Sequence, residues 1–129
     1  MKYIGLEQLL ALHVLAIEQF GGSDGLRDLG RLEAALASQR QEVFGEELYQ
    51  GVYEKAAAIC RGIIGDHPFA DGNKRTAMLA ALTFVEINGL EFVARKGDLE
   101  DFAVQVAVEH LDVPTIAAWL RAHSKEAKR

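Results

Sequence analysis

Residues 67–75 read His-Pro-Phe-Ala-Asp-Gly-Asn-Lys-Arg, and residues 76–87 continue with Thr-Ala-Met-Leu-Ala-Ala-Leu-Thr-Phe-Val-Glu-Ile. The second segment is apolar on nearly every side, which predicts a helix buried in the core of the protein. Pro68 cannot continue a helix from upstream, so residues 67–72 should form a loop in front of that helix. The sequence therefore places a group of polar side chains at the N-terminus of a buried helix.

That position is suited to binding an anion. The first turn of a helix leaves backbone N–H groups without partners and carries about half a unit of positive charge. Phosphate is the anion most often found at such a terminus. Lys74 and Arg75 add two cations, and an arginine can bind a phosphate through two parallel hydrogen bonds. Gly72 allows the backbone to approach a ligand closely, so the pattern indicates a phosphate-binding site.

Two further side chains in the same segment have reactive chemistry. Asp71 offers a hard oxygen donor, which suits Mg²⁺ held between a carboxylate and substrate phosphates. His67 supplies an imidazole, the side chain best suited to accept a proton from a hydroxyl at neutral pH. A base, a metal carboxylate and an anion site together indicate the transfer of a phosphate-containing group to a hydroxyl. The residues alone also allow a structural loop with an unusual charge cluster.

Other chemistries fit this chain less well. A Walker P-loop needs adjacent Gly-Lys and an upstream glycine at a fixed spacing, and residues 72–74 meet neither condition. His67 and Asp71 could chelate a transition metal, but the sequence offers no compelling third ligand. The lone Cys60 lies among alanines and isoleucines, which predicts a buried side chain and not a nucleophile.

The composition sets outer limits on fold and function. The chain has 129 residues, of which 50% are hydrophobic and 26% charged, and this fits one globular domain over residues 1–129. A formal net charge of -5 argues against a direct nucleic-acid partner. A single cysteine excludes an intrachain disulfide and favours a reducing compartment. No secretory signal and no run of about 18 apolar residues is evident, so we expect a cytoplasmic protein without membrane contact.

Helical periodicity in the rest of the chain predicts a compact all-α bundle with, at most, one small hairpin. The expected helices cover residues 6–20, 29–36, 48–64, 76–87, 99–107 and 114–120. Asp98 should cap the fifth of these helices, and residues 90–94 should form a short strand or an extended linker. Residues 125–129 should be a solvated charged tail. His13 lies on the apolar stripe of the first helix, which favours a packed histidine over one in an active site.

Residues 67–75 resemble the signature loop of the Fic/Doc superfamily. Typical Fic proteins, which transfer AMP to hydroxyls, have the motif His-Pro-Phe-x-x-Gly-Asn-Gly-Arg-x-x-Arg. This chain has Lys74 at the second glycine and Met78 at the last arginine, and both departures match the death-on-curing (Doc) branch. Pro68 and Gly72 are closer to Fic, so the loop is mixed. The resemblance covers nearly the whole chain and implies a Fic/Doc-type helical bundle with a small β-hairpin flap.

The resemblance also implies a role for the residues of the loop. His67 matches the general base that takes the proton from the target hydroxyl, and Asp71 matches the Mg²⁺ ligand. Phe69 matches a core anchor without chemistry of its own. The positions expected to bind the phosphates of ATP are Gly72, Asn73, Lys74 and Arg75.

Members of the Doc branch are toxins of bacterial toxin–antitoxin pairs. The resemblance implies transfer of the terminal phosphate of ATP to a threonine of elongation factor Tu, which stops translation. Lys74 favours this kinase reaction, because AMP transfer needs close phosphate contact with the backbone where a glycine normally stands. AMP transfer, favoured by Pro68 and Gly72, is an alternative. A module that binds a nucleotide or a partner without turnover is another, although His67 argues against it.

The resemblance finally implies a docking segment and a form of restraint. Residues 39–45 match the flap, which in the family lies beside the active site and holds the target by strand addition; the residues alone favour an ordinary surface loop. Residues 38–43 are the nearest match to the inhibitory motif Ser/Thr-x-x-x-Glu-Gly/Asn and fail at its last position. We therefore expect restraint by a separate Phd-like antitoxin, whose tail would need an exposed apolar groove on this chain.

Overall fold

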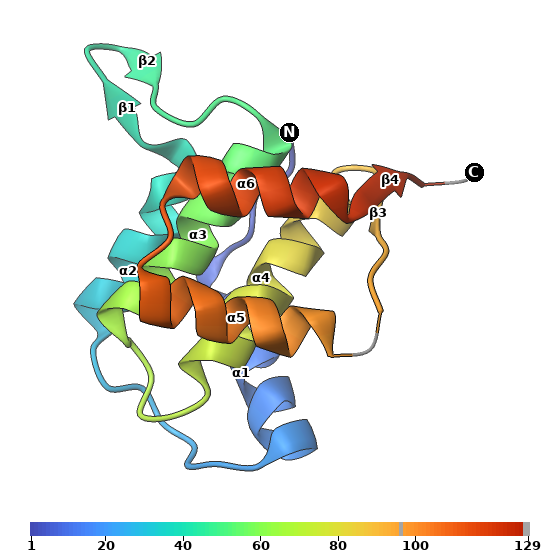
Figure 1. Cartoon of the computed structure of the whole chain (residues 1–129). Coiled ribbons are helices and arrows are strands. Elements are labelled where there is room, and N and C mark those ends of the chain that lie inside the picture. Colours follow the sequence, from blue (N-terminus) through green and yellow to red (C-terminus); the bar gives the residue numbers. More distant parts are fainter. Residues whose placement is uncertain (96, 128–129) are drawn as a thin grey trace.

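The computed structural model of the chain describes residues 1–95 and 97–127, and these residues form a mainly helical bundle (Figure 1). The helices are α1 (Leu6–Phe20), α2 (Leu29–Ala37), the short 3-10 helix η1 (Ser38–Arg40), α3 (Val52–Asp66), α4 (Asn73–Ile87), α5 (Asp98–Glu109) and α6 (Val113–Ala122). The strands are β1 (Glu42–Val43), β2 (Glu46–Glu47), β3 (Leu90–Phe92) and β4 (Ser124–Glu126). The predicted all-α class is confirmed. None of the helices in the described part of the chain is long and apolar enough to cross a membrane.

The centre of the bundle is the pair α3 and α4. α3 contacts α2, α4 and α6, while α4 also contacts α1 and α5. The predicted burial of α4 is confirmed, since Ala77, Ala81 and Phe84 are fully buried. Cys60 of α3 is fully buried as well, and burial raises the pKa of its thiol to about 12. This thiol is not a nucleophile, as the sequence predicted.

The third and fourth helices have different bounds from those predicted. α3 begins at Val52 and not at residue 48, because Gly51 is still extended (φ -94, ψ 165). α3 then runs through Asp66 and ends where His67 adopts a left-handed conformation (φ 49). α4 begins three residues earlier than predicted, at Asn73. The polar motif therefore lies partly in the loop and partly in the first turn of α4.

The hairpin of β1 and β2 differs in extent and place from the predicted flap. Its turn is Phe44-Gly45, both with positive φ (53 and 80), and Val43 pairs with Glu46. It precedes α3, whereas His67 follows α3, a helix of 15 residues that spans about 22 Å. Figure 1 shows the hairpin and the motif loop at opposite ends of α3. The expectation that the flap lies beside the active site is wrong for this structure, because one helix separates the two segments.

The predicted flap also began too early. Gln39 lies in η1 with 4% of its surface exposed. Its side chain accepts a hydrogen bond from Ile4 N (3.0 Å) and donates one to Ile4 O (2.7 Å). Gln39 therefore fastens the N-terminal segment to the bundle and does not face a partner.

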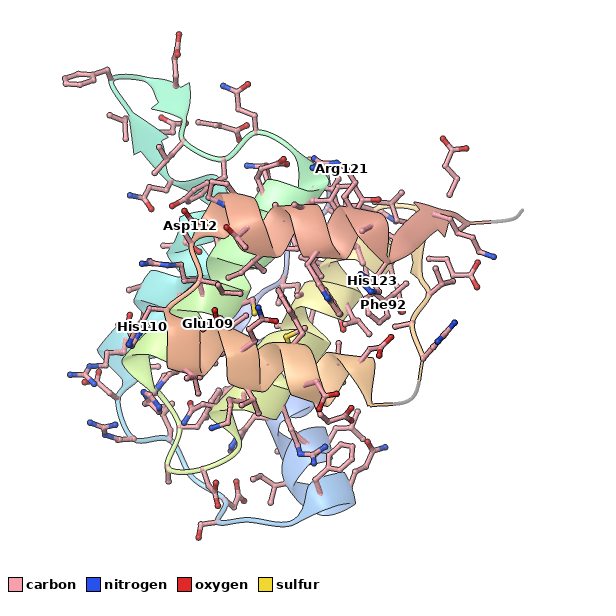
Figure 2. All side chains as sticks on the ribbon, in the orientation of Figure 1. Phe92, Glu109, His110, Asp112, Arg121 and His123 are labelled. Atoms are coloured by element: carbon pink, nitrogen blue, oxygen red, sulfur yellow. The ribbon has the colours of Figure 1, made fainter. Side chains whose placement is uncertain are left out.

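The chain end forms a second small sheet. β4 pairs antiparallel with β3, with Leu90 opposite Glu126 and Phe92 opposite Ser124. The short strand predicted within residues 90–94 is confirmed. Residues 125 and 126 are exposed, as expected for a solvated tail, but they pair with β3, which the sequence did not predict. Residues 128 and 129 lie outside the described residues. Phe92, labelled in Figure 2, lies 5.7 Å from Trp119 between ring centroids, so β3 rests on α6 and offers β4 an edge.

Asp98 does not cap α5 as predicted. It is the first residue of the helix, and Gly97, with φ 92, takes the capping position. The Asp98 carboxylate accepts a hydrogen bond from Arg95 N (3.0 Å), so it closes the turn that leads into the helix.

Replacement of Gln39 tests the anchoring role. In Gln39→Ala the buried N–H and C=O of Ile4 lose their partners, and each unsatisfied group costs about 1–3 kcal/mol. We expect the free energy of unfolding to fall by about 2–4 kcal/mol in urea denaturation. The exposed neighbour Gln41 gives the control, because Gln41→Ala should stay within about 0.5 kcal/mol of the unchanged protein. Equal stability of the two variants would contradict the anchoring role.

Candidate active site

The motif loop is fastened on one side by the segment that leads into α2. Arg27 N and Asp28 N donate hydrogen bonds to Pro68 O (2.8 and 2.9 Å), and Ala70 N donates to Gly25 O (3.0 Å). These bonds form an isolated antiparallel bridge between Leu26 and Phe69. The loop is thus held like a strand, although residues 25–28 are some forty positions away in the sequence.

On the other side the loop is closed by Asn73. Its side-chain Oδ1 accepts from Phe69 N and its Nδ2 donates to Phe69 O, both at 3.0 Å. Phe69 itself is 1% exposed, which confirms the predicted core anchor. The motif suggested that the side-chain amide of Asn73 contacts a phosphate. In the structure that amide is bonded to Phe69, so only the backbone N–H of Asn73 is left for such a contact.

Gly72 makes the turn from the loop into α4. It has a left-handed conformation (φ 75, ψ 17), and a Cβ at this position would lie 3.0 Å from Ile17 Cδ1. Both facts favour glycine. The turn exposes the first N–H groups of α4 to a hollow of about 350 Å³, whose lining includes Asp71, Gly72, Asn73, Lys74 and Arg75. We call it the anion hollow.

The carboxylate of Asp71 is fixed at the rim of the anion hollow. It accepts hydrogen bonds from Ser23 N (3.1 Å) and Gly72 N (2.8 Å). These two bonds, with smaller contributions from His13 and Lys74, hold the pKa of Asp71 below its ordinary value of 3.8. The side chain is therefore an exposed, ionised carboxylate at neutral pH.

These donors fit Mg²⁺ and not a closed metal site. Mg²⁺ commonly binds one or two carboxylates, substrate phosphates and several waters, and Asp71 beside the N-terminus of α4 can supply the carboxylate for such a set. Within residues 1–95 and 97–127, no three His, Cys, Asp or Glu side chains lie together as a metal site. The chelate of His67 and Asp71 with a third ligand therefore finds no support among these residues.

Arg75 reaches away from the loop along two neighbouring helices. Its guanidinium carbon lies 3.5 Å from the centre of the Phe20 ring in α1, and Nη1 lies 3.9 Å from Glu100 Oε1 in α5. Arg75 lines the anion hollow and also a smaller apolar hollow between α1, α4 and α5. Arg75 is thus placed between a candidate phosphate site and an apolar surface.

His67 caps the C-terminus of α3 in a left-handed conformation and is exposed. Arg31 Nη1 donates a hydrogen bond to Asp66 O (2.9 Å), and Arg27 Nη1 donates one to His67 O (3.4 Å). Two arginines therefore satisfy the backbone carbonyls at the C-terminus of α3. Such a conformation in a residue other than glycine costs of order 1–3 kcal/mol and is frequent at functional sites.

The side chain of His67 belongs to a second hollow of about 270 Å³ between the end of α3 and the α5–α6 corner. Arg61, Asp66 and His110 line the same hollow. Figure 2 labels His110 and Asp112 at this corner. The structure therefore gathers Asp71, Gly72, Lys74 and Arg75 in one hollow, while the predicted base borders a different one that shares no lining residue with the first.

Sequence reasoning did not predict that His13 of α1 contacts the motif loop. The prediction of a packed histidine is confirmed, since 3% of its surface is exposed. Its ring is stacked on Phe69, with centroids 3.8 Å apart and an interplanar angle of 4°. Its Nε2 lies 2.9 Å from Asp71 O. A histidine on an apolar stripe was the available signal, but the stripe does not show which loop the ring contacts.

Sequence comparison identifies the family to which this chain belongs. Residues 3–85, which include the whole motif loop and α1 to α3, match the sequence model of the Fic/DOC family. The chain therefore belongs to the Fic/DOC family.

Two curated relatives are similar over almost their entire length. "Toxin Doc" of Mycolicibacterium smegmatis is 36% identical over 129 residues, covering 98% of this chain and 97% of the relative. "Protein kinase doc" of Escherichia phage P1 is 36% identical over 121 residues, covering 94% of each chain. Within the family, the chain is therefore similar to members of the Doc branch, as the sequence motif predicted.

The hydrogen bonds of Asp71 predict a specific dependence of stability on pH. Its pKa is lowered by folding, so the ionised carboxylate stabilises the folded state above pH 3.8 and loses this contribution as the pH falls through the lower pKa of the folded state. In Asp71→Asn we expect lower stability than the unchanged protein at pH 7 and a difference that shrinks below about pH 4. Urea denaturation between pH 3 and pH 7 measures it.

Asp24→Asn serves as the control, because it removes the same charge from the segment between α1 and α2, next to Ser23, which donates a hydrogen bond to Asp71. No hydrogen bond to the Asp24 carboxylate exists among the described residues. A stability difference for Asp71→Asn that is constant with pH, or that grows as the pH falls, would contradict the assigned hydrogen bonds.

Proposed function

We propose that this chain is a Doc-like toxin that transfers the terminal phosphate of ATP to a threonine or serine hydroxyl of a translation factor. Elongation factor Tu is the first candidate target, following the resemblance of the motif. The observation that carries the proposal is the anion hollow, where an ionised carboxylate, the N-terminus of α4 and two cations lie next to the loop that begins with His67. The names of the relatives, "Toxin Doc" and "Protein kinase doc", support the same reading.

The residues of the chain have separate tasks in this reaction. The N–H groups at the start of α4, with Lys74 and Arg75, bind the phosphates. Asp71 would hold Mg²⁺, which when bound would neutralise charge on the phosphates. His67 accepts the proton of the acceptor hydroxyl as its oxygen bonds to the terminal phosphorus, and ADP leaves with the electrons of the broken P–O bond. The imidazole then returns its proton to solvent.

Lys74 favours phosphate transfer over AMP transfer. It is exposed in the first turn of α4 and lines the anion hollow, where a glycine would leave room for the phosphate chain to touch the backbone. A lysine adds bulk and a point charge at this place. AMP transfer is the second candidate, because Pro68 and Gly72 match the Fic motif and the hollow beside His67 offers further space for a substrate.

Mass spectrometry of the target distinguishes these reactions. With purified elongation factor Tu, Mg²⁺ and ATP, we expect a gain of one phosphoryl group, slowed roughly 10²–10⁴-fold in His67→Ala because the general base is lost. His110→Asn is the matched control: it removes an imidazole from the same hollow, and asparagine tolerates the left-handed backbone there (φ 51). This variant should retain the activity.

Other outcomes point to the other readings. A gain of one AMP would replace the kinase by an AMP transferase. Full activity of His67→Ala would contradict the assigned base. Binding of ATP without modification of any bacterial protein would favour a module without turnover.

The partner we propose is a Phd-like antitoxin. The apolar hollow between α1, α4 and α5 has a volume of about 80 Å³ and includes Phe20, Met78, Leu79, Leu99 and Ala103 in its lining. Its apolar lining supports the proposal that part of an antitoxin tail docks here. Arg75 and Glu100 also line it, so a bound tail would lie against the residue proposed to clamp the phosphate. Binding there accounts for restraint of the enzyme from outside its own chain.

Truncation of one wall residue tests this surface. Leu79→Ala removes apolar contact area, so we expect the Kd for a Phd-like antitoxin to rise about tenfold, equivalent to about 1.4 kcal/mol. Isothermal titration calorimetry measures it. Leu29→Ala changes an exposed leucine of α2, far from the hollow in sequence, and should leave the Kd unchanged. Equal effects of the two substitutions would place the antitoxin elsewhere.

A further inference from the structure

We propose that His13 is a positioning residue for the motif loop: its imidazole fixes the main chain at Asp71 and thereby the direction of the carboxylate beside the anion hollow. The consequence for Mg²⁺ rests on the proposed function, in which Asp71 is the metal ligand. The consequence for the loop itself rests only on the geometry of the described residues.

The contact between His13 and Asp71 has a defined polarity. Nε2 of His13 lies 2.9 Å from Asp71 O. A carbonyl oxygen can only accept a hydrogen bond, so Nε2 carries the proton and donates it. Among the described residues, no other group donates to this carbonyl. The carboxylate of the same residue is held by Ser23 N and Gly72 N, so Asp71 is fixed both by its main chain and by its side chain.

His13 also supports the residues on both sides of Asp71. Its ring is stacked on Phe69 at 3.8 Å and is nearly parallel to it, with an angle of 4°. A Cβ added to Gly72 would lie 3.8 Å from His13 Nε2 and Cδ2, so the ring lies close to the turn into α4. One side chain of α1 thus contacts Phe69 and Asp71 and lies near Gly72.

Packing alone does not explain a histidine at this place. The residue lies on the buried side of α1, where Leu9 and Ala16 are also buried, and an apolar side chain would fill it without the cost of burying a polar ring. The flat ring fits the face of Phe69, but a phenylalanine would fit as well. The feature that only the histidine adds is the N–H that reaches Asp71 O.

Two substitutions of His13 test the contribution of its aromatic ring and that of its hydrogen-bond donor separately. His13→Phe keeps a flat ring against Phe69 and removes the hydrogen bond, whereas His13→Gln loses the ring and keeps a side-chain N–H of similar reach. Val14→Ala is the control on the neighbouring, exposed position of α1 (44% exposed). Thermal unfolding of each variant first establishes that the bundle is intact.

The readouts are amide hydrogen exchange in the free protein and the Mg²⁺ dependence of ATP binding. In His13→Phe we expect exchange of residues 69–74 to become roughly tenfold faster, while α3 is unchanged. The Mg²⁺ concentration for half-maximal ATP binding should rise roughly 10-fold or more, as for other residues that orient a metal ligand. Transfer at saturating Mg²⁺ should change much less. His13→Gln should recover both quantities at least in part, and Val14→Ala should match the unchanged protein.

The outcomes separate this proposal from the proposed function. Unchanged exchange in His13→Phe, or equal effects of Phe and Gln, would overturn the positioning role. Faster exchange with an unchanged Mg²⁺ requirement would overturn its link to the Asp71 carboxylate. If the unchanged protein shows no Mg²⁺-dependent ATP binding, the proposed function fails, but the exchange measurements still decide whether His13 holds the loop.

Discussion

The site depends on the two hydrogen bonds by which the Asn73 amide closes the loop onto Phe69. Phe69 is buried, so its N–H and C=O would each cost about 1–3 kcal/mol without a partner. The amide satisfies both groups and forces the chain to turn within the three residues between them. That turn brings the Asp71 carboxylate and the first N–H groups of α4 to the same hollow. Asn73, which the sequence motif suggested as a phosphate-binding residue, therefore has a structural role: it fixes the shape of the loop.

The arrangement separates the parts of the proposed reaction. Phosphate-binding groups come from the start of α4, whereas His67 comes from the end of α3 and borders its own hollow. In the proposed reaction, an acceptor hydroxyl would have to reach both His67 and the bound phosphate. The hairpin lies at the other end of α3 from His67, so the proposed reaction would need other residues, nearer the loop, to hold the acceptor. Arg75, which borders the apolar hollow as well, connects phosphate binding with the surface proposed for an antitoxin.

Much of the candidate site was predictable because its residues are consecutive. His67, Asp71, Gly72, Lys74 and Arg75 fall within nine positions, so a local pattern could indicate their chemistry before any fold was known. Contributions from distant segments were not predictable in this way. The backbone of residues 23–28 holds the loop through its N–H and C=O groups, and such groups leave no mark on the residue types.

The sequence by itself determined the helical class, the buried central helix and the residue types of the motif, because periodicity and residue type are local properties. Only the tertiary structure decided that His13 contacts Asp71, that Gln39 binds Ile4 and that residues 124–126 pair with β3. It also decided that the hairpin lies away from His67. Each of these facts concerns segments that are distant in the sequence. Whether such segments lie close together depends on how the helices pack around α3 and α4 in the core.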